Sequence, residues 1–408
     1  MLRIAAIGAV DDGKSTLIGR LFHDAGSLTE DQVRGLQGAS APGHRDGLNL
    51  SFVTDGLRAE RQQGITIDVA YRYALTPNHK LVLADCPGHL EYTRNTATGA
   101  STADRALVVV DATRGLREQT RRHLAIAMVL GVRDLVVAVN KMDLVAWDRD
   151  VYTRLAAEIG QLAEGMGGAS LIAVPVSAAR GDQVVRRTSA APWYGGPTLL
   201  EALDRAATDP KTSGTGPRLP VQMVAVGPDG YFCVGRLSGG TLRRDDEVVI
   251  LPGGSHSRVL ALDGPSGPIE VARPGMSLRV RLAGCPAVTR GDVIAHPGSA
   301  PRLWSTALTT VCWLTGPPAR AGSQFQIKHL TLTSRAEVLS VAAVLDMNSL
   351  RMVPAAEVAA NSIGLVRWRF DRPLAADPYA HSRATGAFIA LAPGTRTTVG
   401  AGMISAFQ

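Results

Sequence analysis

Over the first half of the chain, short apolar runs alternate with segments whose apolar positions repeat at helical spacing. The runs contain few polar residues and are rich in Val, Ile and Leu, which is typical of strands buried on both faces of a mostly parallel sheet. They lie at residues 2–7, 81–84, 108–110, 135–139 and 171–176. Helical length and spacing are found at residues 17–22, 119–130 and 151–165. The pattern predicts an α/β domain over residues 1–209, with helices on both faces of the sheet.

The pattern changes after residues 210–217, a stretch of Gly, Pro, Ser and Thr that is typical of a linker. Beyond it, short β-rich runs recur with glycine turns between them, as in small β-barrels. These runs lie at residues 220–226, 231–237, 247–251, 258–262, 277–282, 307–314, 323–332, 336–344, 364–370 and 386–391. A second boundary near residues 298–301 divides them. We therefore expect two β-barrel domains, at residues 218–300 and 301–408.

A glycine-rich turn joins the first predicted strand to the first predicted helix, and it matches the GxxxxGK[ST] motif of phosphate-binding loops. Its residues are Gly8, Ala9, Val10, Asp11, Asp12, Gly13, Lys14, Ser15 and Thr16. The glycines let the backbone aim successive N–H groups at phosphate oxygens, and the start of the helix adds its positive end. We expect Lys14 to contact the β and γ phosphates and the Ser15 hydroxyl to bind Mg²⁺. The sequence assigns no physical role to Asp12.

A second motif, DxxG, directly follows the predicted strand at residues 81–84. With the residue after it, the motif comprises Asp85, Cys86, Pro87, Gly88 and His89. A carboxylate at a strand end suits a Mg²⁺ contact through water, and a glycine N–H suits a sensor of the γ-phosphate. We expect His89 to orient the attacking water of a nucleotide hydrolysis, a task that glutamine performs in some nucleotide hydrolases. Taken alone, DxxG is also the sequence of an ordinary turn.

Two further motifs follow the next predicted strands. They are Asn140, Lys141, Met142 and Asp143, and then Ser177 and Ala178. The Asp143 carboxylate can accept two hydrogen bonds from N1–H and the amino group of guanine, a donor pair that adenine lacks. A backbone N–H of the Ser177-Ala178 pair can donate to guanine O6. Because all four motifs follow strands of one sheet, we expect them at the edge where α/β sheets bind ligands.

Between the phosphate-binding loop and DxxG lies Thr66. A threonine hydroxyl here can add a Mg²⁺ ligand while γ-phosphate is present and release it after hydrolysis, which makes the segment a switch. Without the other motifs, Thr66 would simply be a β-branched strand residue. We therefore expect GTP and Mg²⁺ as ligands, with His89, Lys14 and Thr66 as catalytic residues. The predicted metal contacts are Ser15, Thr66 and, through water, Asp85.

Composition is that of an ordinary globular protein, with 45% hydrophobic and 19% charged residues among 408. The net charge of +7 is spread along the chain rather than clustered, so we do not expect nucleic-acid binding from it. Four cysteines, Cys86, Cys233, Cys285 and Cys312, have neither metal-site spacing nor a disulfide framework. Because the first predicted strand starts almost at Met1, we expect no signal peptide. No apolar run approaches the roughly 18 residues of a membrane span. We expect a cytoplasmic protein that does not contact a membrane.

Several short sequences around these motifs resemble the translation-factor class of GTPases, which includes elongation factor Tu. They lie at residues 85–89, 95–100, 119–120 and 131–132. Other sequences resemble the large, GTPase subunit of bacterial heterodimeric sulfate adenylyltransferase. They lie at residues 10–21, 55–72, 192–200, 361–366 and 398–404. This second resemblance covers nearly the whole chain and is looser over residues 218–301.

The resemblance implies a GTP-hydrolysing subunit that pairs with a small catalytic subunit in a heterodimer or a higher oligomer. In that family the partner binds ATP and sulfate, and the complex forms adenosine 5′-phosphosulfate and pyrophosphate, an uphill reaction that GTP hydrolysis drives. The sequence agrees in one respect. Its nine histidines include no His-x-x-His or His-x-Gly-His pair for adenylyl transfer, and we find no second nucleotide motif.

The alternative is a translation-factor-type GTPase that binds tRNA or the ribosome. The class resemblance and the basic charge favour it. Asp12 and the run at residues 68–72 favour the sulfate adenylyltransferase subunit instead.

Overall fold

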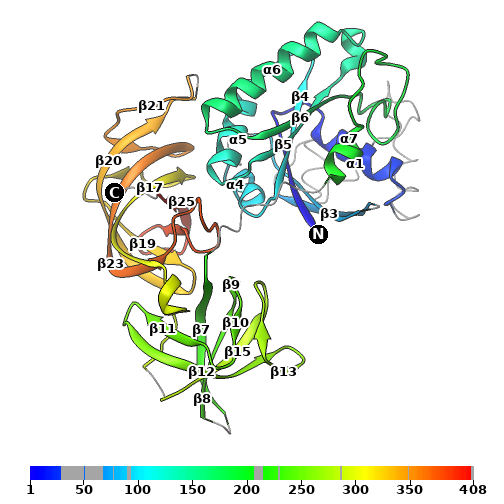
Figure 1. The fold of residues 1–408 in the computed structure, drawn as a ribbon. Coiled ribbons are helices and arrows are strands. Elements are labelled where there is room, and N and C mark those ends of the chain that lie inside the picture. The colour runs from blue at the N-terminus through cyan, green and yellow to red at the C-terminus, as the bar shows by residue number, and fades with distance from the viewer. Residues whose placement is uncertain are drawn as a thin grey trace. The chain divides into compact units, whose positions relative to one another are not determined.

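The structure is a computed structural model that describes residues 1–28, 50, 68–76, 78–89, 93–205, 215–227, 230–284, 287–347 and 349–405. It divides into two compact units, Met1–Pro210 with Asp346–Arg351, and Lys211–Leu345 with Met352–Gln408. The first unit holds a six-stranded sheet with its helices, and the second holds two closed barrels (Figure 1). The predicted fold class, an α/β domain of the P-loop type followed by two β-barrels, is confirmed.

The sheet has strand order β2-β3-β1-β4-β5-β6, in which β2 is antiparallel to β3 and all other neighbours are parallel. Its strands are β1 (Leu2–Ile7), β2 (Ala70–Leu75), β3 (Lys80–Asp85), β4 (Arg105–Asp111), β5 (Asp134–Asn140) and β6 (Ser170–Pro175). Every residue of β4 and β5 is buried, which explains their continuous apolar runs. Ala6 pairs with Asp85 and Asp111 with Asn140 at the carboxyl ends. The loops that follow β1, β3, β4 and β5 therefore meet at one edge.

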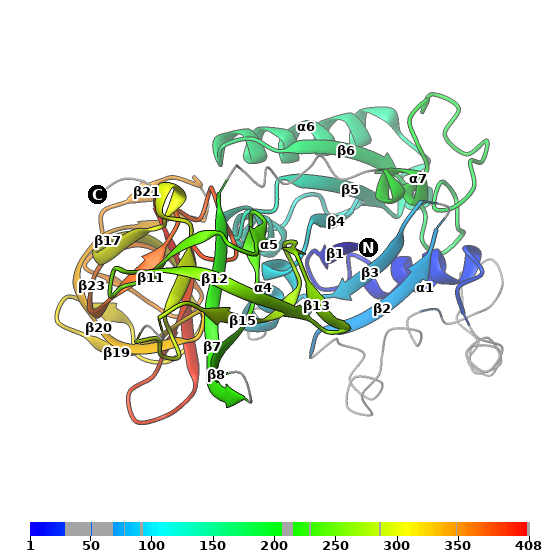
Figure 2. The same ribbon diagram turned by 60° about the horizontal axis from the view of Figure 1, so that its bottom comes forward.

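Helices cover both faces of this sheet (Figures 1 and 2). They are α1 (Lys14–Asp24), α4 (Thr93–Ser101), α5 (Glu118–Val129), α6 (Arg149–Gly165) and α7 (Leu199–Asp204), with a 3₁₀ turn η3 (Met142–Val145) after β5. Leu17 of α1 and Leu199 of α7 share one core with the alternate strand residues Ile4, Leu107 and Val136. Helices α4, α5 and α6 lie in a row on the other face, where α5 contacts β1 and β4. This contact places α5 beside the loop that follows β1.

Each barrel of the second unit is closed by six strands. The first has the order β11-β16-β7-β8-β15-β12 and closes by pairing of β12 with β11. Its strands are β7 (Pro217–Gly227), β8 (Gly230–Arg236), β11 (Glu247–Leu251), β12 (Ser255–Gly264), β15 (Ser277–Leu282) and β16 (Val293–Ala295). Short pieces accompany them: β9 (Ser238–Gly239), β10 (Leu242–Arg243), β13 (Gly267–Ile269), β14 (Val271–Ala272) and the 3₁₀ turn η4 (Pro297–Ser299).

The second barrel has the order β19-β24-β25-β17-β23-β20 and closes by pairing of β20 with β19. Its strands are β17 (Arg302–Trp313), β19 (Gln324–His329), β20 (Leu332–Leu345), β23 (Ser362–Ala376), β24 (Ala387–Leu391) and β25 (Thr398–Ile404), with the short β18 (Ala319–Arg320), β21 (Met352–Val353) and β22 (Glu357–Val358). Its core contains Trp313, Phe325 and Trp368, whose rings meet edge to face at 4.9 and 6.0 Å between centroids.

The strand predicted at residues 323–332 is wrong. The structure has a hairpin there, because β19 ends at His329 and β20 begins at Leu332, opposite it. Leu330 takes a φ of 52° in the turn, a conformation that a leucine signals poorly. The apolar run continues through the turn and therefore hides it.

The two barrels are joined by a buried ion pair. Arg218 of β7 donates from Nε and Nη2 to the two carboxylate oxygens of Asp377, at 3.0 and 2.9 Å. The Thr385 hydroxyl donates to the same carboxylate at 2.7 Å. Each charge therefore has directional partners, which a buried ion pair requires.

Among the described residues, no helix combines the length and the apolar character needed to cross a membrane. Cys86, Cys233 and Cys312 are buried free thiols.

Candidate nucleotide-binding site

The loop between β1 and α1 turns at two residues with positive φ, Asp11 at 66° and Gly13 at 88°. Left-handed residues in such a loop turn N–H groups toward one side and form a concavity that binds anions. A side chain at Gly13 would not fit, since a Cβ there would lie 2.4 Å from Nδ2 of Asn140. Helix α1 begins at the next residue, so its positive end lies at the same concavity.

Lys14 is the buried cation of this loop. Its Nζ donates to the carbonyl oxygens of Gly8 and Ala9 at 3.1 and 2.8 Å. Burial lowers the pKa of Lys14, although the nearby carboxylates of Asp85 and Asp12 act against that change. A buried ammonium held by backbone carbonyls is well placed to exchange one of them for a phosphate oxygen.

The DxxG turn packs directly on the phosphate-binding loop. A Cβ added to Gly88 would lie 2.7 Å from Nζ of Lys14 and 2.9 Å from the backbone nitrogen of Val10, so only glycine fits there. The Thr96 hydroxyl of α4 donates to the carbonyl of Pro87 at 3.1 Å and holds the turn from another side. His89 follows Gly88, and its side chain is exposed to solvent.

Two oxygen groups that could bind a metal ion, one from α1 and one from β3, lie next to each other. The Ser15 hydroxyl donates to Oδ2 of Asp85 at 3.2 Å, and Asp85 is fully buried. A hydroxyl and a carboxylate are hard oxygen ligands that suit Mg²⁺, an ion that usually also binds substrate phosphates and water. The residues present therefore fit the predicted metal. Thr66, the third predicted ligand, lies outside the described residues.

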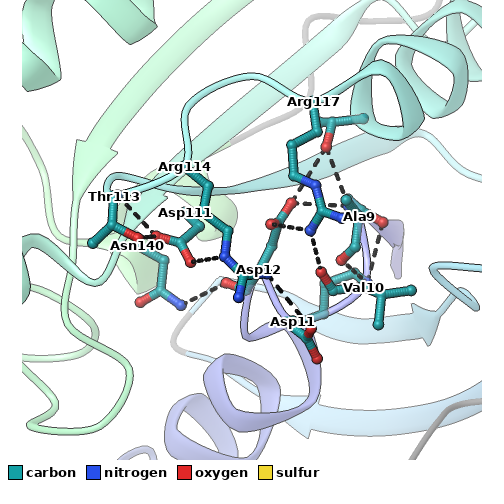
Figure 3. Close-up of polar contacts among 12 residues, drawn as sticks. Ala9, Val10, Asp11, Asp12, Asp111, Thr113, Arg114, Arg117 and Asn140 are labelled. Atoms are coloured by element: carbon teal, nitrogen blue, oxygen red, sulfur yellow. Dashed lines mark hydrogen bonds and ion pairs between the residues drawn. The ribbon is translucent and has the colours of Figure 1, made fainter.

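Asn140 joins three of the predicted motifs. Its Nδ2 donates to the carbonyl oxygen of Asp12 at 2.9 Å (Figure 3). Its Oδ1 accepts the backbone N–H of Ala178 at 3.0 Å. The phosphate-binding loop, the NKxD motif and the Ser177-Ala178 pair are thus brought together as the sequence predicts. The Ala178 amide already has a partner in Asn140, which guanine O6 would share or replace.

The remaining NKxD residues are also tied to charged neighbours. Lys141 donates to the carbonyl oxygen of Asp11 at 2.6 Å and to Oδ2 of Asp111 at 2.7 Å. Burial acts to raise the pKa of Asp111, but hydrogen bonds from Lys141 and Thr113 hold it below its ordinary value. Asp143, whose side chain is mostly buried, lies 3.5 Å from Nε of Arg180.

Sequence reasoning missed the support that α5 gives to the phosphate-binding loop. His123 is fully buried, and burial lowers its pKa to about 3, so its ring is neutral. Its Nδ1 lies 3.1 Å from the carbonyl oxygen of Gly8 and must donate there, while Nε2 accepts from Gln119 at 2.8 Å. The helical spacing of Gln119, Thr120 and His123 on one face was the available signal.

Asp12 was also missed as a structural residue. It is fully buried, and its Oδ2 accepts the backbone N–H of Ala9 at 2.9 Å and the Thr120 hydroxyl at 3.3 Å. Burial raises the pKa of Asp12, whereas the Ala9 amide, Lys14 and Arg117 lower it. No local sequence signal points to these contacts, because Thr120 and Arg117 lie more than a hundred residues further along the chain.

Two known protein families match parts of this chain. Residues 1–209 match the family described as the elongation factor Tu GTP binding domain, and residues 307–405 match the family described as GTP-eEF1A C-terminal domain-like. Two solved structures of Sup35, complexed with GDP and with GMPPNP, align with 100% and 99% of this chain and 94% and 93% of theirs. They share 22% identity with it, at TM-scores of 0.45 and 0.46.

Curated relatives resemble nearly the whole chain. The bifunctional enzyme CysN/CysC of Mycobacterium tuberculosis is 43% identical over 99% of this chain and 67% of its own length. Sulfate adenylyltransferase subunit 1 of Aeromonas hydrophila is 41% identical over 99% of this chain and 86% of its own, and the protein of that name from Tolumonas auensis is 40% identical over the same shares. With its GTP-binding domain and this likeness along its length, the chain belongs to the sulfate adenylyltransferase subunit 1 (CysN) family of elongation factor Tu-like GTPases.

Proposed function

We propose that this chain is the GTP-hydrolysing subunit of a sulfate adenylyltransferase. The observation that carries the proposal is the direct contact among the phosphate-binding loop, the DxxG turn and the NKxD motif at one edge of the sheet. GTP hydrolysis drives the formation of adenosine 5′-phosphosulfate and pyrophosphate from ATP and sulfate. The relatives named sulfate adenylyltransferase subunit 1 support this assignment.

The phosphate end of the site has four proposed parts. Lys14 neutralises charge on the β and γ phosphates, and the amide of Gly88 senses the γ-phosphate. Ser15, Thr66 and, through water, Asp85 hold Mg²⁺, which supplies positive charge beside the transferred phosphoryl group. His89 orients the attacking water, and its exposed side chain leaves it accessible for that task.

The base end selects guanine. The Asp143 carboxylate accepts hydrogen bonds from N1–H and the amino group, and the Ala178 amide donates to O6. Adenine has an acceptor at N1 and lacks the 2-amino group, so it would offer this mostly buried carboxylate no hydrogen-bond donor from the base.

The sulfate chemistry belongs to a partner. The word "subunit" in the relatives' names supports a complex, and the chain has no histidine pair suited to adenylyl transfer. We assign ATP and sulfate binding to a small catalytic subunit, which forms at least a heterodimer with this chain in the cytoplasm.

The proposal is tested by co-purifying the chain with a candidate small subunit and measuring GTP hydrolysis. We expect hydrolysis to rise when ATP and sulfate are added together. Stimulation by aminoacyl-tRNA or ribosomes, with none by the small subunit and its substrates, would instead support the translation-factor alternative.

A further inference from the structure

The first half of the phosphate-binding loop is held by Asp12 of the loop itself and by Arg117, the residue before α5 (Figure 3). Thr120 of α5 adds a contact with Ala9. We propose that Asp12 and Arg117 are positioning residues for GTP hydrolysis, which fix the Ala9–Val10 segment beside the terminal phosphate. This inference rests on the proposed GTPase function.

Asp12 turns its carboxylate toward α5 and fastens the loop to that helix. One oxygen accepts the Ala9 amide and the Thr120 hydroxyl, and the Thr120 oxygen in turn accepts the Ala9 amide at 3.1 Å. The other oxygen, Oδ1, is buried and has no hydrogen-bond donor among the described residues. It lies 3.9 Å from Nη1 of Arg117, which supplies the opposite charge.

Arg117 is the residue immediately before α5, and it holds Val10. Its Nη1 donates to the carbonyl oxygen of Val10 at 2.8 Å. A guanidinium that contacts a backbone carbonyl and a buried carboxylate together has little freedom to move, although 38% of its side chain is exposed. Arg117 and Asp12 therefore restrain the same two residues of the loop.

The restrained segment borders the place where the γ-phosphate is sensed. Val10 has Arg117 on its carbonyl oxygen, and its nitrogen lies beside Gly88, whose added Cβ would come within 2.9 Å. Lys14, which donates to the Ala9 carbonyl, touches the same glycine position at 2.7 Å. A shift of Ala9 and Val10 would thus move the Lys14 ammonium and the contact with DxxG together.

A positioning role would explain why a carboxylate lies at residue 12 of this loop. A fully buried carboxylate in an anion-binding loop opposes phosphate binding by charge, so an uncharged residue would serve a simple cradle better. The negative charge of Asp12 is explained if it serves to hold the Arg117 guanidinium against the carbonyl of Val10.

The test uses the complex of this chain with its small subunit, ATP and sulfate, and it measures kcat and KM for GTP hydrolysis and Kd for GDP. We expect Arg117→Ala to lower kcat about tenfold through loss of alignment, while Kd for GDP changes by less than about threefold. Arg117→Lys keeps a donor for Val10 and should recover part of kcat. Asp12→Asn, which keeps the shape and an oxygen acceptor, should lower kcat to a similar degree.

Because both residues act through one segment, their effects should not multiply. We expect kcat of the double variant to be at most about twofold lower than kcat of the worse single variant. Arg121→Ala is the matched control, since this arginine of α5 pairs with Glu158. Unchanged kcat in both single variants, or an equal loss of kcat and of GDP affinity, would overturn the positioning role. If the unmodified complex fails to hydrolyse GTP, the proposed function itself is wrong.

Discussion

At the scale of single residues, our proposal gives Lys14 the largest part in the phosphate chemistry. Its ammonium is buried and held by two loop carbonyls, so it is fixed where the β and γ phosphates are expected. A cation in a water-excluded site interacts with an anion far more strongly than an exposed one does.

We expect Lys14→Ala to remove GTP-dependent stimulation, with a fall in hydrolysis of at least roughly 100-fold. The measurement is phosphate release from GTP in the complex with the small subunit. Lys328→Ala, which changes an exposed lysine of β19, is the control and should hydrolyse GTP normally. A Lys14→Ala complex that GTP still stimulates would remove the phosphate-binding loop from the mechanism.

By our proposal, Asp143 sets the choice of base. Replacing it with Asn removes the charge and presents a donor, so the match to the two guanine donors is lost. We expect Asp143→Asn to weaken GTP binding by roughly 100-fold and to shift the preference toward xanthosine triphosphate. Competition of the two nucleotides for the site measures this shift. Asp150→Asn, an exposed change in α6, should leave it unaffected; a retained preference for GTP in Asp143→Asn would contradict the role of the carboxylate.

Much of the site could be predicted at this scale, because each motif combines its chemistry in a few consecutive residues. Gly13, Asn140 and Ala178 lie close together because Asn140 ends one strand and the other two lie in loops that follow neighbouring strands of the same sheet. Asp12 could not be predicted. Its partners Thr120 and Arg117 are supplied by α5, and no short sequence pattern records a contact between elements so far apart in the chain.

At the scale of elements, α5 supports the phosphate-binding loop from behind, and His123 is the residue that makes this support depend on pH. Its pKa is about 3 in the folded chain, against about 6.5 when unfolded. Below pH 6.5 the unfolded chain therefore binds a proton that the folded chain does not. As the pH is lowered through this range, this one group reduces the free energy of unfolding by about 1.4 kcal/mol per pH unit.

Between pH 7 and pH 5, we expect His123→Gln to lose less unfolding free energy than the unmodified chain. The difference should equal the contribution of the one proton that His123 takes up on unfolding. Urea unfolding at several pH values measures the slope. His329, whose pKa is also lowered by burial, contributes in the same direction and remains in both proteins, so the comparison isolates His123. Equal slopes would mean that His123 is protonated in the folded state.

The barrels depend on the pair of Arg218 and Asp377 in a different way. Removing one partner of a buried ion pair leaves the other charge unpaired, which costs about 3–5 kcal/mol. We expect Arg218→Leu to destabilise the barrels by that amount in thermal or urea unfolding, and Arg218→Leu with Asp377→Leu to recover most of it. Arg320→Ala breaks an exposed pair and should cost less than about 1 kcal/mol. A single variant as stable as the unmodified chain would show that the charge is solvated.

Element types were largely predictable because burial leaves continuous apolar runs in β4 and β5 and glycine turns separate the barrel strands. The hairpin between β19 and β20 was not, since Leu330 gives no turn signal. Closure of each barrel was expected from strand spacing alone, whereas the strand order that closes it depends on pairings between distant residues.

At the scale of the whole molecule, the chain joins a GTP-binding domain to two barrels and, by our proposal, to a second subunit. To drive sulfate activation, GTP hydrolysis by this domain must raise the yield of sulfate adenylation, which is unfavourable by itself. Binding of GTP alone would shift affinities but would not move the equilibrium of sulfate adenylation, because a ligand that is not consumed leaves the overall reaction free energy unchanged.

The most direct test is the amount of adenosine 5′-phosphosulfate that the complex with the small subunit forms from ATP and sulfate at equilibrium. With GTP, we predict accumulation above the level reached without guanine nucleotide, together with release of phosphate from GTP. A non-hydrolysable GTP analogue should give no accumulation above that level. Equal yields with GTP, with the analogue and without nucleotide would contradict the coupling of GTP hydrolysis to sulfate adenylation.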